Sequence, residues 1–223
     1  MINWKSLSLF LLTLLIIIGI LTTAGFIAYG RGIDFLSEKH PEILITPKNL
    51  ATYKANPTYV ETFKEYKDSN YSIMLPPGYS VFQVKDEPAI NLEDPNRKWT
   101  ITLDEKLLRY EESLESEKHL NNPEGDYYIL LENIYSANRN PILLAQKILY
   151  LPSSATTIKN IETPHAKGFY IISEQGEKRT EIYRLFDKYF WHNITVTIHD
   201  PAYPHSKIET IIATLKNSNP AIE

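Results

Sequence analysis

The most constraining feature of this sequence is a long uncharged stretch close to its N-terminus. No charged residue lies between Lys5 and Arg31, and residues 7–29 are mainly Leu, Ile, Phe and Ala. As an α-helix, these roughly 23 residues extend about 34 Å, enough to cross the roughly 30 Å hydrocarbon core of a bilayer. Trp4 and Tyr29 flank the stretch, and aromatic residues favour the membrane interface. The sequence therefore predicts one transmembrane helix within residues 1–30.

The short lead before this helix predicts its orientation. A cytoplasmic N-terminus would place the helix in the inner membrane of a cell and the rest of the chain in the periplasm or its equivalent outside the cytoplasm. The alternative is a signal peptide cleaved after Thr22-Thr23-Ala24, a small-x-small site, which would make the protein secreted. The apolar stretch continues past that site to Tyr29. This continuation favours an uncleaved anchor.

The composition limits the classes of protein that the exported part can belong to. The chain contains no cysteine, which excludes disulfides, a lipid-modified cysteine, thiol catalysis, zinc–thiolate sites and iron–sulfur clusters. About 190 residues beyond the apolar stretch are enough for one ordinary core. The formal net charge is −4, and this argues against nucleic acid and anionic lipid headgroups as general partners.

Two segments follow the anchor. Residues 31–55 contain Pro41 and Pro47 with only one short apolar group, at 43–45, and are predicted to form a stalk or linker. The alternative is that part of this segment packs as an edge strand. Residues 56–223 are predicted to form the folded extracytoplasmic domain.

Local patterns predict the elements of the first part of this domain. Asn56-Pro57 combines an N-cap residue with a proline suited to the first helical turn. Alternating apolar and polar residues predict strands, and Pro76-Pro77-Gly78 predicts a turn between two of them. The expected elements are a helix at 57–67 and strands at 71–75, 80–84 and 98–104.

The middle of the chain is less regular. Residues 105–120 are acidic over a possible helical stripe, and residues 121–125 are predicted to form a loop. Residues 127–135 are apolar on all sides and fit a buried strand or a helix equally well. Asn140-Pro141 predicts a second capped helix, which ends near Pro152.

The last third carries the clearest architecture. Three segments rich in aromatic and β-branched residues, at 168–174, 179–186 and 190–199, are joined by short connections and predict an antiparallel meander. A terminal helix is predicted from a capping box, Ser206 with Glu209, and from a stripe of apolar residues that would cross one face of the sheet. The predicted fold class is α+β, an antiparallel β-sheet flanked by helices and preceded by one N-terminal transmembrane helix.

The lack of short catalytic motifs favours a non-catalytic domain. No phosphate-binding loop, dinucleotide fingerprint, HExxH, GxSxG or EF-hand loop occurs, so no cofactor and no metal are predicted. His192 and His199 would point to opposite faces of one strand. His199, Asp200 and His205 can still converge across the intervening loop. Such a set would suit acid/base or metal-dependent chemistry.

Tyrosines at turns suggest a recognition surface instead. The chain has 15 tyrosines, and Tyr79, Tyr189 and Tyr203 lie at turns rather than at periodic core positions. Tyrosine offers a large contact area with little loss of rotamer entropy. The alternative is that these rings simply cover the edges of the sheet.

The order of elements resembles a known family. A helix leads into an extended segment at 71–79 with the sequence YSIMLPPGY, the meander opens with Gly168-Phe169-Tyr170, and the terminal helix carries IIATL at 211–215. This order resembles the PsbP/Mog1 family of α/β/α sandwiches over about residues 66–217. The resemblance implies an accessory or binding domain of a larger assembly and assigns no site residue. The apparent anchor and the lack of a metal cluster depart from the photosystem-associated members.

We therefore expect a single-pass membrane protein of the cell envelope whose exported domain binds or assists a partner protein without catalysis. The expected binding residues lie in the turns and the histidine-containing loop: Tyr79, Tyr189, Tyr203, His199, Asp200 and His205. The alternative is an extracytoplasmic hydrolase or metal-dependent enzyme that uses the His/Asp set.

Overall fold

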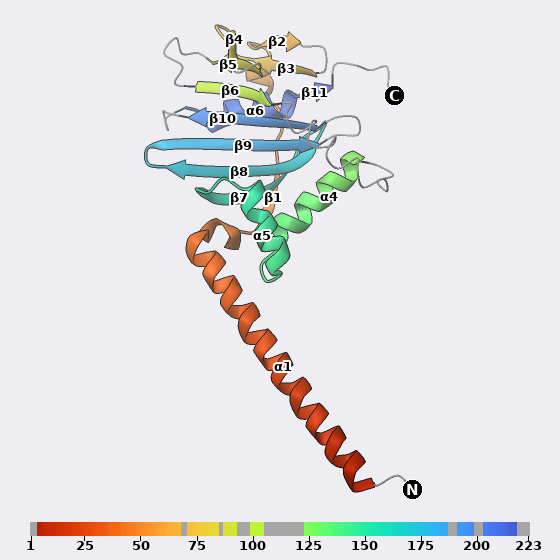
Figure 1. Ribbon diagram of the computed structural model, residues 1–223. Helices are drawn as coiled ribbons and strands as arrows, with labels where there is room; N and C mark the ends of the chain where they lie inside the picture. The colour runs from red at the N-terminus through yellow and green to blue at the C-terminus, as the bar shows by residue number, and fades with distance from the viewer. Residues whose placement is uncertain are drawn as a thin grey trace.

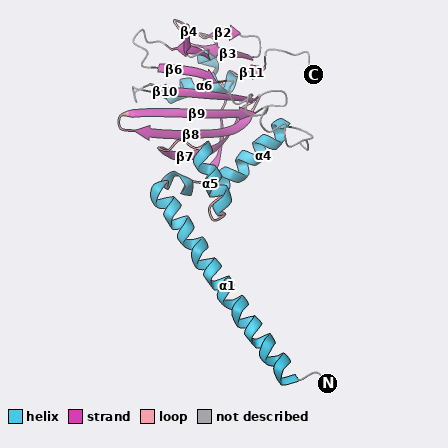
Figure 2. Ribbon diagram, in the orientation of Figure 1, coloured by secondary structure: helices cyan, strands magenta, loops and turns pink. Residues whose placement is uncertain are grey.

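The protein consists of an α+β body and one long helix that projects from it (Figure 1). The computed structural model describes residues 4–67, 71–84, 87–92, 99–104, 123–186, 191–198 and 203–217. The predicted acidic helix at 105–120 lies outside these residues. Figure 2 shows α4 and α5 at the end of the body near α1, and α6 farther from α1, beside β6 and β10.

The projecting helix, α1 (Trp4–Lys39), has 36 residues and extends about 54 Å at the usual helical rise. Its last turns pack against the body, where Ile33 and Leu36 contact a small core cluster. The preceding turns lie clear of the body (Figure 1). The structure describes side chains of α1 only from Thr13 onward. Among the described residues, no helix is both long enough and apolar enough to cross a membrane.

A mixed eight-stranded sheet forms the centre of the body. Its order is β1-β7-β8-β9-β10-β6-β5-β4, and β1 and β7 lie at the edge nearest α1 (Figure 1). The strands of this sheet are β1 (Lys48–Thr52), β4 (Ser80–Val84), β5 (Glu87–Asn91), β6 (Trp99–Asp104), β7 (Ala155–Glu162), β8 (Lys167–Gln175), β9 (Lys178–Phe186) and β10 (Trp191–Ile198).

The prediction of a wholly antiparallel sheet is wrong at one edge. β1 pairs with β7 in parallel, whereas the other pairs of this sheet are antiparallel. A parallel pair requires a long crossover connection, and most of the domain lies between these two strands in the sequence. β1 falls within residues 31–55, so the edge-strand alternative describes part of the predicted linker. The rest of that segment continues α1 to Lys39 and forms the 3-10 helix η1 (Pro41–Leu44).

A three-stranded sheet with the order β11-β3-β2 lies at the end of the body farthest from α1 (Figure 1). Its strands are β2 (Lys64–Lys67), β3 (Tyr71–Leu75) and β11 (Lys216–Asn217). The predicted helix at 57–67 is therefore too long, because α2 (Pro57–Val60) ends after one turn. Residues 64–67 pair with β3 instead, and this ladder outweighs the helical spacing of the aromatic residues.

Two helices cover opposite faces of the main sheet. Along β8, Tyr170 joins the core cluster beneath α6 (His205–Thr214), while its neighbours Phe169 and Ile171 join the cluster beneath α4 (Pro123–Ser136). This alternation is the two-residue period of a strand buried on both faces. The four predicted apolar positions of the terminal helix, Ile208, Ile211, Ile212 and Leu215, are all buried.

Two predicted helix starts differ from the structure. α6 begins at His205 with Pro204 as the N-cap and no side-chain cap, so the predicted capping box does not form. Ser206 is already inside the helix, and Glu209 lies 3.5 Å from the His205 ring. Residues 123–125, predicted as loop, open α4, because a proline is favourable in the first helical turn. α4 also settles the ambiguous segment 127–135 as helix.

A buried lysine joins α4 to α5 (Pro141–Tyr150). Lys147 is fully buried, and its ammonium donates to the carbonyl oxygens of Tyr135 (2.8 Å) and Ala137 (3.1 Å). These carbonyls belong to the C-terminal end of α4, where helical carbonyls lack partners within the helix. Burial lowers the pKa of Lys147 to about 8. Asn140 caps α5 as predicted, since its side-chain oxygen accepts from Ile142 N and Leu143 N.

Candidate functional site

A buried carboxylate forms the centre of a polar cluster in the body. Glu181 lies in the middle of β9 and is 1% exposed. Arg179, two residues earlier and therefore on the same face, places its guanidinium 2.7 Å from Glu181 Oε1. The hydroxyl of Tyr183, two residues later, donates to Glu181 Oε2 at 2.8 Å. The alternation of one strand thus supplies the carboxylate and two of its partners.

The helix on this face supplies a histidine. His205 opens α6, and its Nδ1 lies 3.8 Å from Glu181 Oε2. Its Nε2 lies 3.5 Å from Glu209 Oε1, one helical turn further on. His205 is thus bracketed by a buried and a partly exposed carboxylate. The arrangement ties the first turn of α6 to the centre of the sheet.

Three tyrosines surround this cluster. Tyr170 and Tyr183 stack with ring centroids 4.8 Å apart, and Tyr53 meets both rings edge-on. Burial raises the pKa of Tyr170 and of Tyr183, and the charge of Glu181 raises both further. Burial also raises the pKa of Tyr53, followed by the charges of Glu209 and Glu181. All three phenols therefore stay protonated near neutral pH. Tyr183 donates to Glu181, whereas the hydroxyl of Tyr170 accepts from the Arg179 guanidinium at 3.2 Å.

In this cluster, the negative charge of the buried Glu181 is neutralised by Arg179. The Glu181 carboxylate faces a guanidinium and a phenol, so both of its oxygens already have partners. Among the residues that the structure describes, no group of three or more His, Cys, Asp or Glu side chains is arranged to hold a metal ion. Through His205, the cluster connects the first turn of α6 to β9.

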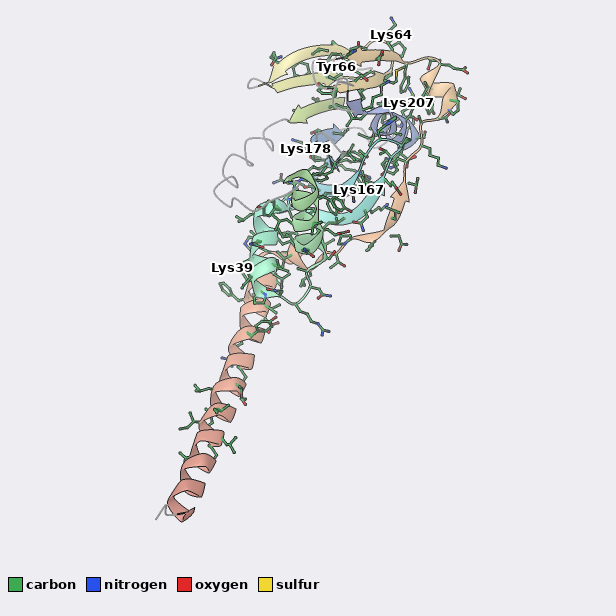
Figure 3. The ribbon with its side chains drawn as sticks, turned by 90° about the vertical axis from the view of Figure 1, so that its right-hand side faces the viewer. Lys39, Lys64, Tyr66, Lys167, Lys178 and Lys207 are labelled. Carbon is green, nitrogen blue, oxygen red and sulfur yellow. The ribbon has the colours of Figure 1, made fainter. Side chains whose placement is uncertain are left out.

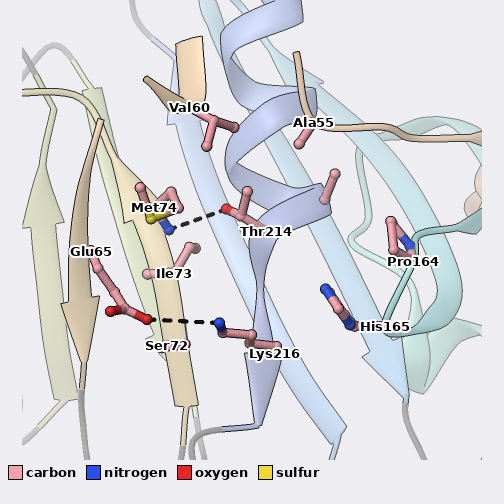
Figure 4. A pocket seen from close by; sticks show the side chains of 11 residues that line it. Ala55, Val60, Glu65, Ser72, Ile73, Met74, Pro164, His165, Thr214 and Lys216 are labelled. Carbon is pink, nitrogen blue, oxygen red and sulfur yellow. Dashed lines mark hydrogen bonds and ion pairs between the residues drawn. The ribbon is translucent and has the colours of Figure 1, made fainter. Parts of the chain in front are cut away.

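A cavity lies on the same face but further along α6. It has a volume of about 320 Å³ and is bounded by the end of α6, by β3 and by the turn between β7 and β8 (Figure 4). Thr214 accepts a hydrogen bond from Met74 N at 3.1 Å on one side, and Lys216 pairs with Glu65 at 3.9 Å on another. Its lining also includes the apolar residues Ala55, Val60, Ile73, Pro164 and Ala213 together with Ser72 and His165.

The structure places only some of the predicted site residues. Tyr189, His199 and Asp200 lie outside the described residues, so the convergence of the His/Asp set stays a prediction. Tyr79 and Tyr203 are half-buried and pack against the main core cluster. The ring of Tyr79 meets that of Tyr66 edge-on, and Lys207 lies 5.6 Å over the ring of Tyr203. His205, as described above, pairs with Glu181 and Glu209.

Sequence reasoning missed Arg179 and Glu181. Their signal is present: the strand at 179–186 places Arg179, Glu181 and Tyr183 on one face. Charged residues are rarely fully buried unless they are paired, and opposite charges on one strand face can form such a pair. The cavity has no comparable signal, because its lining comes from segments far apart in the sequence.

Comparisons with known proteins assign neither a family nor a function to this chain. No family model and no curated protein matches this chain. A solved structure from Bacteroides thetaiotaomicron is similar over 68% of this chain, with 11% sequence identity and a TM-score of 0.39. This chain spans 46% of the length of that protein. A similarity this low identifies neither a shared fold nor a shared function, and the PsbP/Mog1 resemblance stays a prediction.

Proposed function

We propose that this protein is a single-pass membrane protein of the cell envelope that holds a non-catalytic binding domain outside the cytoplasm. The observation that carries the proposal is the exposed apolar surface of α1. Leu15, Ile16, Ile20, Leu21 and Ile27 are each more than half exposed, on a helix that stands clear of the body (Figure 1). Burying a side chain of this kind stabilises by about 1.5–3 kcal/mol. A bilayer would bury all of them at once.

The junction between α1 and the body supports a fixed orientation of the domain relative to α1. Ile33 and Leu36 of α1 pack with Ile43 of η1 and Leu144 of α5 in one small cluster. The Tyr29 hydroxyl also donates to the carbonyl oxygen of Arg139. The helix that would enter the membrane is thus continuous with a packed part of the body. A domain held in this way would keep the same end, the one that carries β2 and β3, directed away from α1 (Figure 1).

The cavity beside α6 supports the binding role. Its lining combines β3 and β11, which belong to the sheet farthest from α1, with the turn between β7 and β8 (Figure 1). An apolar lining with polar groups at its sides suits an apolar side chain of a partner protein, fixed by a few polar contacts. In a membrane-anchored protein, this cavity would lie on the body outside the bilayer, because none of its lining residues belongs to α1. The proposed partner is therefore another protein of the envelope.

Alkaline extraction of membranes tests the anchor. We expect the full chain to remain in the membrane pellet, and a Leu15→Arg/Leu21→Arg variant to appear mainly in the soluble fraction, because each arginine at mid-membrane costs about 2.5–3.5 kcal/mol. Leu149→Arg is the matched control, since Leu149 is 78% exposed but lies on α5. It should stay in the pellet.

Two outcomes would contradict the proposal. One is extraction of the unaltered chain by alkali as a soluble protein. The other is equal retention of the unaltered chain and the double-arginine variant, which would show that something other than α1 holds the protein on the membrane. Circular dichroism of the soluble fraction should show that the α+β body of the variant remains folded.

A further inference from the structure

The body touches α1 at the point where its uncharged stretch ends. Tyr29 is the last aromatic residue before Arg31, and its hydroxyl donates to the carbonyl oxygen of Arg139. Arg139 belongs to the connection between α4 and α5. The name α4–α5 corner is used here for residues 138–142, which include the end of this connection and the first two residues of α5. This hydrogen bond fixes the corner at the level of Tyr29 along α1. If residues 7–29 lie in the bilayer, that level is the membrane interface.

The chemistry of the α4–α5 corner fits an interface. Asn138, Arg139 and Asn140 are exposed, and Ile142 is 70% exposed. A single exposed isoleucine is ordinary on a protein surface. Here it lies within three residues of an arginine whose carbonyl oxygen is bonded to the interfacial Tyr29. Apolar side chains flanked by arginine are typical of surfaces that rest in the headgroup region.

α5 leads away from this level. Its first turn adjoins the corner, and its later residues Leu144 and Ile148 share a cluster with Ile33 and Leu36 of α1. The two helices therefore run side by side in the same direction. Leu149 lies seven residues beyond Ile142 on the same helical face, so about 10 Å separates them along the axis. Leu149 is 78% exposed. The two residues are therefore similarly exposed but would lie at different distances from the bilayer.

We propose that the α4–α5 corner rests on the bilayer, with Ile142 at the boundary between headgroups and acyl chains and with Arg139 beside the lipid phosphates. The inference rests on the proposed membrane anchor and adds a second point of contact. Two contacts fix both the height and the tilt of the body, and one helix alone would leave the tilt free. The net charge of −4 opposes general adsorption to anionic lipids, so the contact is local to this corner.

Site-specific fluorescence can test this contact, because the chain has no cysteine of its own. Single-cysteine variants of the full chain, Ile16→Cys, Ile142→Cys, Leu149→Cys and Lys178→Cys, would each carry an environment-sensitive NBD label in phosphatidylcholine/phosphatidylglycerol nanodiscs. Quenching by spin labels on the lipid headgroup or deep in the acyl chain then reports the height of each label. Lys178 is exposed in the hairpin between β8 and β9, well away from α1 (Figure 3).

We expect deep quenching at position 16, and headgroup-level quenching at position 142 that is several-fold stronger than at 149 or 178. Deep quenching at 16 without quenching at 142 would overturn the α4–α5 contact and leave the anchor standing. Equal quenching at 142 and 149 would also overturn it, because the body would then lie flat. No quenching at 16 would remove the anchor and the inference together.

Discussion

Gly168→Ala is expected to destabilise the body strongly, and more than an alanine at any other glycine that the structure describes. A Cβ built at Gly168 would lie 1.7 Å from the carbonyl oxygen of Arg184, on the neighbouring strand. No rotamer can relieve this contact, because the backbone fixes the position of a Cβ and the opposing oxygen is itself a backbone atom. β8 and β9 would have to separate at the Gly168–Leu185 pair, next to the end of their ladder. We expect a loss of about 3 kcal/mol or more in the free energy of unfolding, measured by urea denaturation of the isolated chain in detergent.

Gly176→Asn provides the matched control, since Gly176 lies in the turn of the same hairpin. Its φ of +62° favours glycine, but no atom lies within 4 Å of an added Cβ. Asparagine tolerates this left-handed region, so the loss should stay below about 1 kcal/mol. Equal stability of Gly168→Ala and the unaltered protein would mean that β8 and β9 do not pair in the described register.

The second large effect is expected at the buried carboxylate. Arg179→Met would leave Glu181 buried without its guanidinium partner, which costs about 3–5 kcal/mol for a buried pair. Arg179 is partly exposed, so we expect the lower end of this range. Glu181→Leu would instead leave the buried Tyr183 hydroxyl without its acceptor, at about 1–3 kcal/mol. Denaturation curves of both variants give the two values.

The double variant Arg179→Met/Glu181→Leu distinguishes a coupled pair from two independent contacts. Because the double variant removes both charges together, its loss should be clearly smaller than the sum of the single losses. Lys178→Ala, at the exposed neighbouring position, should change stability by no more than about 0.5 kcal/mol. If the loss of stability in the double variant equalled the sum of the two single losses, Arg179 and Glu181 would not act as a coupled pair.

The strands of the last third were predictable because their pattern is local. Residues 168–174 and 179–186 alternate or run continuously apolar, and short turns join them, so the β8–β9 pair follows from the sequence. The strand at 71–75 and the turn at 76–78 are confirmed for the same reason. The apolar stripe of the terminal helix also predicted its buried face correctly.

The errors arose where pairing with another segment decides the structure. Residues 64–67 form a strand because they pair with the neighbouring β3, and residues 48–52 join the sheet through a parallel partner more than 100 residues away. Neither pairing leaves a signal in the local sequence. At the candidate site, His205 was identified from the sequence, but its actual partner Glu181 was not. The predicted partners His199 and Asp200 lie outside the described residues.

The most direct test of the central claim, that α1 crosses a membrane and holds the body on its outer side, is cysteine labelling in cells. Lys64 is exposed and lies at the end of the body farthest from α1 (Figure 3), and Lys5 lies at the N-terminal end of α1. With an intact inner membrane, we predict that a membrane-impermeant maleimide labels Lys64→Cys and not Lys5→Cys, which reacts only after lysis. Labelling of Lys64→Cys only after lysis would contradict the claim.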